Sequence, residues 1–183
     1  MSSRSLRRRD DGFDVFVGGT TRDLLRTVSL IVWDPAVAED VVQESLLQVA
    51  RRWSRVRRMD RPAAYARRVA TNLAIAAAER RATERAELAA GLVFEPEDAA
   101  ARLALEQVAR QRDLDAAIGR LAPRQRAVLV LRFFEDLTEA QTAQTLGCSI
   151  GTVKSTCSRA LARLRIDLRG GTSVEPDPTQ STH

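Results

Sequence analysis

Apolar residues recur at helical spacing along most of the chain. Between Phe13 and Val32 they repeat every three or four positions, which predicts an amphipathic helix. Asp34 and Pro35 then suit the N-cap and the first position of a second helix. One apolar stripe of that second helix consists of Val42, Leu46, Val49 and Trp53. This spacing is typical of a helix face that packs on a core.

A third helix is predicted to begin at Arg61-Pro62. Its inward stripe is Ala66, Val69 and Leu73. Arg67, Arg68 and Asn72 point away from that stripe. No segment shows a convincing strand-like alternation, and aromatic residues make up only 4% of the chain, so the core must be built from Leu, Val and Ala. The sequence therefore predicts an all-α protein.

The helical pattern weakens in the middle of the chain, where Gly91 and Pro96 interrupt it. We place a domain boundary there, because 183 residues suffice for two small helical lobes. The predicted organisation is a basic N-terminal extension (1–12), a first helical domain (13–82), a flexible acidic linker with some helical segments (83–104), a second helical domain (105–168) and a disordered tail (169–183).

Charge is distributed in blocks. Residues 51–81 carry ten arginines against two acids, and residues 148–169 carry five basic residues against one acid. Between them, residues 84–106 carry six acids against two arginines. With a formal net charge of +5, the chain is predicted to bind a polyanion through two basic blocks.

Several functional classes lack the residues that they need. Cys148 and Cys157 do not form a metal-binding CxxC pair and the only histidine is His183, so we expect no metal site and no cofactor. No nucleophile, metal cluster or phosphate-binding glycine loop assembles, so we do not expect an enzyme. The longest apolar run, Val28 to Trp33, is too short to cross a membrane, and no export signal is visible. We expect a cytoplasmic protein without membrane insertion.

The strongest local motif runs from Thr138 to Arg165 and predicts a helix-turn-helix. Thr138 and Gln141 form a capping box that marks the start of its first helix. Ala143 is small where the two helices must cross, Gly147 suits the left-handed turn, and Val153 packs back into the crevice. Ser149 can cap the second helix, and its buried side would be Val153, Cys157, Leu161 and Leu164.

The outer face of the second helix suits DNA. Side chains there could read base edges in the major groove and bind phosphates. The candidate residues are Thr152, Lys154, Ser155, Ser158, Arg159 and Arg163. The alternative is a helical hairpin that packs for stability alone, with its charges solvated. Cys157 is better explained as a small core residue than as part of a redox switch with Cys148.

The motif together with the preceding segment, LAPRQRAVLVLRFFEDL (Leu121 to Leu137), closely resembles the C-terminal domain of extracytoplasmic-function (group 4) sigma factors of the sigma-70 family, of a type common in actinobacteria. AEDVVQESLLQVARRW (Ala38 to Trp53) resembles the core-polymerase-binding segment of that family. PAAYARRVATN (Pro62 to Asn72) resembles its promoter-melting segment. The resemblance covers most of the chain from Phe13 to Leu168 and implies an alternative sigma factor that directs promoter-specific transcription initiation.

The resemblance also implies roles for individual residues. The first domain would bind a coiled coil of the largest subunit of core RNA polymerase through Asp40, Gln43, Glu44 and Leu47. It would bind minus-10 promoter DNA through Tyr65, Arg67, Arg68, Asn72, Arg80 and Arg81. The second domain would bind minus-35 DNA. Two positions depart from the family pattern: Tyr65 replaces the usual tryptophan, and Ala76 replaces a common aspartate. The family further implies an anti-sigma factor as a partner.

Three other functions compete with this interpretation. A stand-alone helix-turn-helix regulator would bind DNA without polymerase, and the Ala38 to Trp53 segment argues against it. An enzyme would need a catalytic constellation, which this sequence lacks. An anti-sigma factor or scaffold would not explain two basic blocks around an acidic spacer. For that spacer we hypothesise that Glu84 to Asp98 threads a basic channel of the polymerase.

Overall fold

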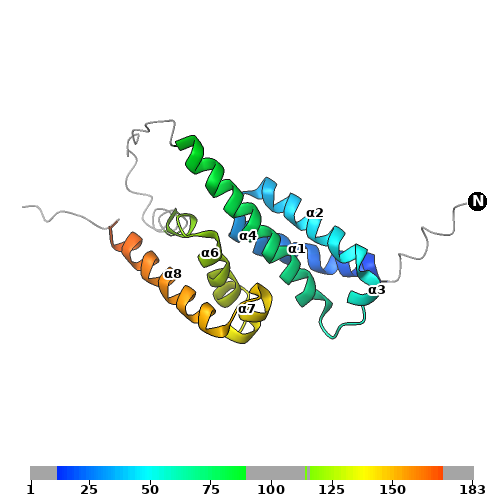
Figure 1. Cartoon of the computed structure of the whole chain (residues 1–183). Helices are drawn as coiled ribbons and strands as arrows, with labels where there is room; N and C mark the ends of the chain where they lie inside the picture. The colour runs from blue at the N-terminus through cyan, green and yellow to red at the C-terminus, as the bar shows by residue number, and fades with distance from the viewer. Residues whose placement is uncertain (1–11, 90–113, 115, 171–183) are drawn as a thin grey trace, which may run out of the picture.

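A computed structural model of the chain describes residues 12–89, 114 and 116–170. In these residues every regular element is helical, which confirms the predicted all-α fold (Figure 1). Residues 1–11 of the basic extension, the tail from residue 171 and most of the predicted linker, including the greater part of the Glu84 to Asp98 segment, lie outside the described residues. None of the described helices is long and apolar enough to cross a membrane.

The N-terminal lobe consists of α1 (Phe13–Val32), α2 (Pro35–Arg51), the short α3 (Trp53–Val56) and α4 (Pro62–Ala89). Helices α1, α2 and α4 pack against one another in pairs. Their shared core contains Val28, Ile31, Val42, Val49, Ala66 and Ala74, all buried. Alanines on α4 let the helices approach closely, which explains how a chain with few aromatic residues fills its interior.

The predicted start of α2 is confirmed. One carboxylate oxygen of Asp34, Oδ1, accepts hydrogen bonds from the amides of Ala36 and Val37, at 3.0 and 3.2 Å. Pro35 occupies the first helical position, where its missing N–H removes no intrahelical bond. A side-chain cap of this kind contributes about 1 kcal/mol to helix stability. The chain therefore turns from α1 into α2 within two residues.

Two details differ from the sequence prediction. Helix α2 ends at Arg51, so Trp53 does not continue its apolar stripe but begins α3. The indole packs on the rings of Phe13 and Phe16, with centroids 5.2 and 5.0 Å apart. Helix α4 continues to Ala89, so the first part of the predicted linker is one of its helical segments.

The C-terminal lobe follows from a helical turn at residues 116–119. It consists of α6 (Pro123–Leu129), a π-helical turn η2 (Val130–Phe134), α7 (Glu139–Leu146) and α8 (Ile150–Gly170). Leu131, Ala143, Leu146, Val153 and Ala160 are buried in its core. Glu135 N–H donates to the carbonyl of Val130, and Leu137 N–H donates to that of Leu131. These bonds widen the helix before the chain turns into α7.

The two lobes contact each other. Helices α1 and α4 of the first lobe pack against α6, η2 and α7 of the second (Figure 1). Buried hydrophobic residues of both lobes form one continuous cluster. Arg67 and Arg68, two of the predicted minus-10 residues of α4, therefore lie beside the C-terminal lobe.

Candidate nucleic-acid and polymerase interfaces

The helix-turn-helix has the geometry that its sequence predicts. Thr138 Oγ1 accepts from the Gln141 amide at 3.2 Å, while Gln141 Oε1 accepts from the Thr138 amide at 2.8 Å. Gly147 ends α7 with φ 63°, a left-handed conformation that is strained for residues with a Cβ atom. Ala143 and Val153 are buried where α7 and α8 meet. The capping box, the turn and the crossing point are all confirmed.

One side of helix α8 packs against α6 and α7. Ser149 Oγ accepts from the Thr152 amide at 3.0 Å and so caps the helix, as predicted. Val153 and, in addition to the predicted residues, Thr156 and Ala160 are buried, while Cys157, Leu161 and Leu164 are half-buried. Burial raises the pKa of the Cys157 thiol, and Arg132 nearby only partly offsets it. A thiol that stays protonated suits the interpretation of Cys157 as a packing residue.

The opposite side of α8 is open. The exposed residues include all six candidates for minus-35 contact: Thr152, Lys154, Ser155, Ser158, Arg159 and Arg163. Lys154 Nζ lies 3.6 Å from a carboxylate oxygen of Glu139, and the Arg159 guanidinium donates to the Ser155 carbonyl at 3.2 Å. These exposed contacts are weak in water, so a DNA phosphate can replace them.

Asp167 organises the far end of α8. Its carboxylate binds Arg163 on the same helix and Arg120 from the start of the lobe, each at 3.2 Å. Burial pushes the pKa of Asp167 upward, but the hydrogen bond from Arg120 and the charges of both arginines outweigh it and lower the pKa overall. Arg163 is therefore exposed to solvent but already paired within its own helix.

The predicted polymerase-binding residues share one surface of α2. Asp40, Gln43 and Glu44 are exposed, and Leu47 beside them is 53% exposed. Gln48 donates to Glu44 at 3.1 Å, which orients that carboxylate along the helix. An apolar side chain surrounded by carboxylates suits docking to a basic helical partner.

The predicted minus-10 residues of α4 have more varied surroundings. Arg68, Asn72 and Arg80 are exposed, whereas Arg81 pairs with Asp34 at 2.8 Å. The Tyr65 hydroxyl accepts a hydrogen bond from Arg52 at 3.0 Å. This contact joins the aromatic ring of α4 to the arginine-rich segment that follows α2.

Arg67 differs most from expectation. Its Nε lies 3.1 Å from Glu135 Oε2, in the other lobe, and its side chain is 27% exposed. The sequence prediction that Arg67 points away from the N-terminal core holds, but the side chain meets the C-terminal lobe instead of solvent. Glu135 was not identified from the sequence, because an acid beside Phe134 and Asp136 carries no pattern that marks it as a partner of α4.

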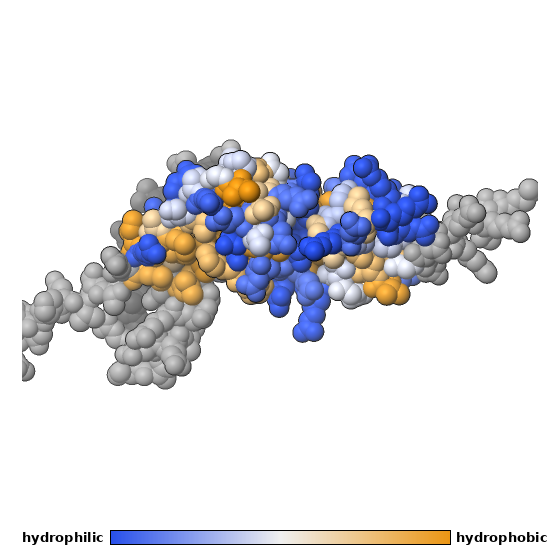
Figure 2. All heavy atoms as spheres, turned by 90° about the horizontal axis from the view of Figure 1, so that it is seen from below, coloured by the Kyte–Doolittle hydropathy of each residue, from blue (hydrophilic) through white to orange (hydrophobic). Residues whose placement is uncertain are grey.

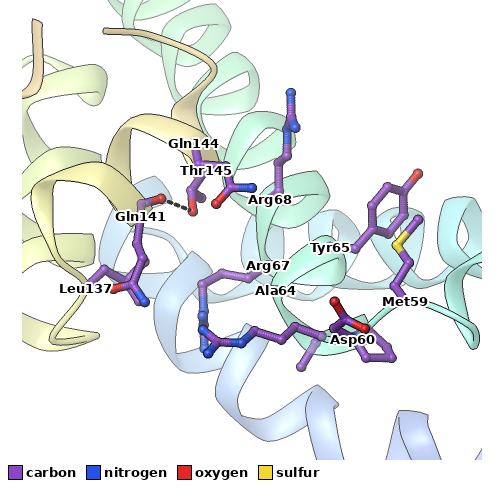
Figure 3. A pocket seen from close by; sticks show the side chains of 13 residues that line it. Met59, Asp60, Ala64, Tyr65, Arg67, Arg68, Leu137, Gln141, Gln144 and Thr145 are labelled. Atoms are coloured by element: carbon purple, nitrogen blue, oxygen red, sulfur yellow. Dashed lines mark hydrogen bonds between the residues drawn. The ribbon is translucent and has the colours of Figure 1, made fainter. Parts of the chain in front are cut away.

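A cleft of about 650 Å³ lies between α4 and α7, and Figure 3 shows the side chains that line it. Tyr65, Arg67 and Arg68 line it from α4, and Gln141, Gln144 and Thr145 line it from α7. Figure 2 shows that hydrophilic residues cover the middle of the face seen from below, whereas most of the hydrophobic residues gather toward its left. The described residues contain no group of three or more potential metal ligands.

The helix-turn-helix with an exposed, basic α8 face has the geometry of a helical DNA-binding protein, and the exposed acidic side chains of α2 form a separate surface around Leu47. Comparison with protein families gives the same answer. Residues 19–84 match the model of sigma-70 region 2, and residues 111–164 match that of sigma-70 region 4.

Named relatives extend the match over both lobes. The RNA polymerase sigma-E factor of Streptomyces avermitilis is 36% identical over 85% of this chain and 84% of its own length. The factor of the same name from Streptomyces coelicolor is 38% identical over 85% of each chain. The chain belongs to the extracytoplasmic-function sigma factors of the sigma-70 family. It is a DNA-binding sigma factor of promoter-specific transcription initiation.

Solved structures support the fold. The sigma factor RpoE of Bartonella quintana, solved with the anti-sigma factor NepR, superposes with a TM-score of 0.58 at 22% identity, over 86% of this chain and 96% of that one. The PhyRSL–NepR complex from Sphingomonas sp. Fr1 gives a TM-score of 0.53 at 19% identity, over 91% and 94%. At such identities the likeness concerns the arrangement of helices.

Proposed function

We propose that this sigma factor divides its work among three surfaces. The exposed face of α8 binds the minus-35 duplex, the polar face of α4 binds the minus-10 strand, and the α2 face around Leu47 binds core RNA polymerase. The observation that carries the proposal is that one chain presents both an open recognition helix and an exposed acidic face with an apolar centre. A DNA-binding regulator alone would not need the second surface.

At the minus-35 element, α8 would enter the major groove by its N-terminal half. Lys154, Arg159 and the three hydroxyl residues Thr152, Ser155 and Ser158 lie on the side opposite the buried Val153. Arginine and lysine donate to guanine edges and phosphates, and hydroxyls can donate or accept. Arg163 lies farther along α8. Its ion pair with Asp167 favours a role in positioning the helix near the DNA backbone.

At the minus-10 element, α4 would hold the melted strand. Arg68, Asn72 and Arg80 offer exposed donors along one helix, and Tyr65 offers a ring on which a base can stack. Arg52 holds the Tyr65 hydroxyl and would extend the positive path toward α3. Arg67 and Arg81 would join this surface once they leave Glu135 and Asp34.

At the polymerase, Asp40, Gln43 and Glu44 would meet basic residues of the coiled coil of the largest subunit, with Leu47 as the apolar centre. In the proposed organisation residues 13–82 and 105–168 are the two functional domains. We place the protein in the cytoplasm, where core polymerase and promoter DNA are. The chain would act by binding and not by catalysis.

An anti-sigma factor is a proposed further partner. The Bartonella quintana sigma factor, which shares this fold, was solved in complex with the anti-sigma factor NepR. On this chain an anti-sigma factor would compete with polymerase for the α2 face or with DNA for the α4 face, since both are surfaces that transcription requires.

The proposal is tested by in vitro transcription from a genomic promoter library, with purified core polymerase in the presence and absence of the protein. We expect new start sites that share upstream minus-35 and minus-10 sequences. DNA binding without new start sites, and without copurification with core polymerase, would favour a stand-alone regulator.

A further inference from the structure

One carboxylate, that of Glu135, takes part in two polar contacts between the lobes. The side chain of Glu135 is only 7% exposed, although it follows the exposed Phe134. Its Oε2 binds Arg67 of α4, and its Oε1 binds the hydroxyl of Thr27 of α1, which is 2% exposed. Both partners belong to the N-terminal lobe. Glu135 is thus a residue of one lobe whose charge is satisfied by the other.

Neighbouring side chains also make contacts between the two lobes. The Arg26 guanidinium of α1 lies 4.7 Å from the centre of the Phe134 ring. Arg68 of α4 reaches the turn of the helix-turn-helix, where its Nη2 lies 3.9 Å from the position of a Cβ atom on Gly147. At the end of α1, the Trp33 ring lies against Gly119 and 5.8 Å from the Arg126 guanidinium. The lobes therefore meet through polar and aromatic contacts as well as through the shared hydrophobic cluster.

The π-helical turn places Glu135 at this contact. In the wider η2 turn, the Glu135 N–H donates to the Val130 carbonyl, five residues earlier. The next residue, Asp136, has a left-handed backbone with φ 49°. Glu135 then faces Arg67, while the Asp136 side chain stays exposed. Of these two adjacent acids, Glu135 therefore contacts the other lobe, whereas Asp136 does not.

We propose that Glu135 is an intramolecular latch: its carboxylate occupies Arg67 in place of a DNA phosphate and holds the two lobes closed until promoter DNA and polymerase separate them. The inference rests on the proposed function of α4 as the minus-10 surface. A carboxylate and a phosphate offer a guanidinium the same kind of charged acceptor, so they compete for it. The same contact lies beside the cleft between α4 and α7, which Arg67 and Arg68 line (Figure 3).

The latch can be measured without DNA or polymerase. Nitroxide labels on Ser54→Cys in α3 and Ala162→Cys in α8, both exposed positions, report the distance between the lobes by double electron–electron resonance. Cys148→Ser and Cys157→Ala remove the native thiols from every sample. Glu135→Gln keeps the size of the side chain and removes its charge. Asp136→Asn is the matched control, because it makes the same change at an exposed neighbour and asparagine tolerates positive φ.

We expect Glu135→Gln to shift the distance distribution to longer values and Asp136→Asn to leave it unchanged. Glu135→Arg should open the chain further, and Arg67→Glu added to it should restore the closed distance by reversing the pair. Circular dichroism would verify that each variant keeps its helices. Distances that match the unsubstituted chain in both Glu135 variants would overturn the latch.

A second measurement tests the competition with DNA. Fluorescence anisotropy with labelled oligothymidine, a single strand that offers phosphates without a promoter sequence, should show roughly threefold or more tighter binding by Glu135→Gln, because more of the chain is open. Asp136→Asn should bind as the unsubstituted chain does. Opening without tighter binding would overturn the claim that Glu135 shields the DNA surface. A negative transcription assay would refute the proposed function while leaving the distance measurement interpretable.

Discussion

The two basic helices for which we propose DNA contacts, α8 and α4, differ in the partners of their basic side chains. On α8, Lys154 and Arg163 contact acids of their own lobe, Glu139 and Asp167. On α4, Arg67 contacts an acid of the other lobe. The basic residues of α8 that the structure describes thus contact only their own lobe, whereas Arg67 of α4 is engaged by the other lobe and Arg68 and Arg80 stay exposed. Whether a basic side chain is available to a DNA phosphate therefore depends on packing between distant segments and not on the local sequence pattern.

The energetics of the two pairings also differ. Both side chains of the Lys154–Glu139 pair are exposed, and such pairs contribute about 0–1 kcal/mol. The Glu135 side chain is only 7% exposed, so separation from Arg67 must be compensated by new contacts for both groups. We therefore expect α8 to bind a duplex without rearrangement, whereas α4 requires the lobes to move before Arg67 can bind a strand.

The largest expected effect is on the open helix. Lys154→Ala combined with Arg159→Ala should weaken binding to minus-35 duplex by roughly thirtyfold or more, because two contacts of about 1–3 kcal/mol each are lost. Loss of two phosphate contacts should also flatten the salt dependence. Anisotropy titrations at several salt concentrations measure both, with duplexes taken from the start sites found by transcription.

Arg22→Ala is the control for this pair, since it removes an exposed arginine from α1 in the other lobe. Glu135→Gln should leave duplex binding unchanged, which would sharpen the contrast between the two helices. Normal affinity in the double variant would refute the assignment of the recognition face.

A smaller effect is expected at the third surface. Asp40→Ala combined with Gln43→Ala should weaken binding to core polymerase by roughly tenfold, as expected for polar groups around an interface centre. Biolayer interferometry with immobilised core enzyme measures the change. Glu39→Ala is the matched control, because it removes an exposed carboxylate from the same turn on another side of α2. Unaltered holoenzyme assembly by the double variant would count against this face.

The smallest effect concerns the anchor of α8. Because the pKa of Asp167 is lowered in the folded chain, its stabilising contribution is present above the unfolded value of about 4 and is lost as pH falls through the folded value. Asp167→Asn should remove that part of the acid sensitivity and slightly lower the melting temperature at neutral pH. Thermal melts across the acidic range measure it, and parallel curves for the two proteins would contradict it.

Much of the fold could be predicted because its signals are local. The Asp34 cap, the Thr138 capping box and the Gly147 turn each depend on residues within four positions of one another. The amphipathic stripes of α1, α2 and α8 likewise follow from helical periodicity. The end of α2 at Arg51 was missed, because the apolar spacing through Trp53 satisfies a continuous helix equally well.

The candidate sites were predictable to different degrees. The exposed faces of α8 and α2 could be predicted because the apolar pattern shows which side of each helix is buried, and the opposite side is then exposed. The surroundings of Arg67 were not predictable in this way. Thr27 and Glu135 stand 108 positions apart, and no periodicity links them. The π-helical turn that aims Glu135 at Arg67 also has no distinct sequence pattern in VLRFF.

The sequence by itself determined which segments are helical, where most of them begin and which residues each helix turns outward, because backbone hydrogen bonds, caps and amphipathic spacing act over a few residues. Only the tertiary structure decided which of those outward residues stay open to a partner. That outcome depends on how the two lobes pack, because this packing brings Arg67 of one lobe within 3.1 Å of the Glu135 carboxylate of the other.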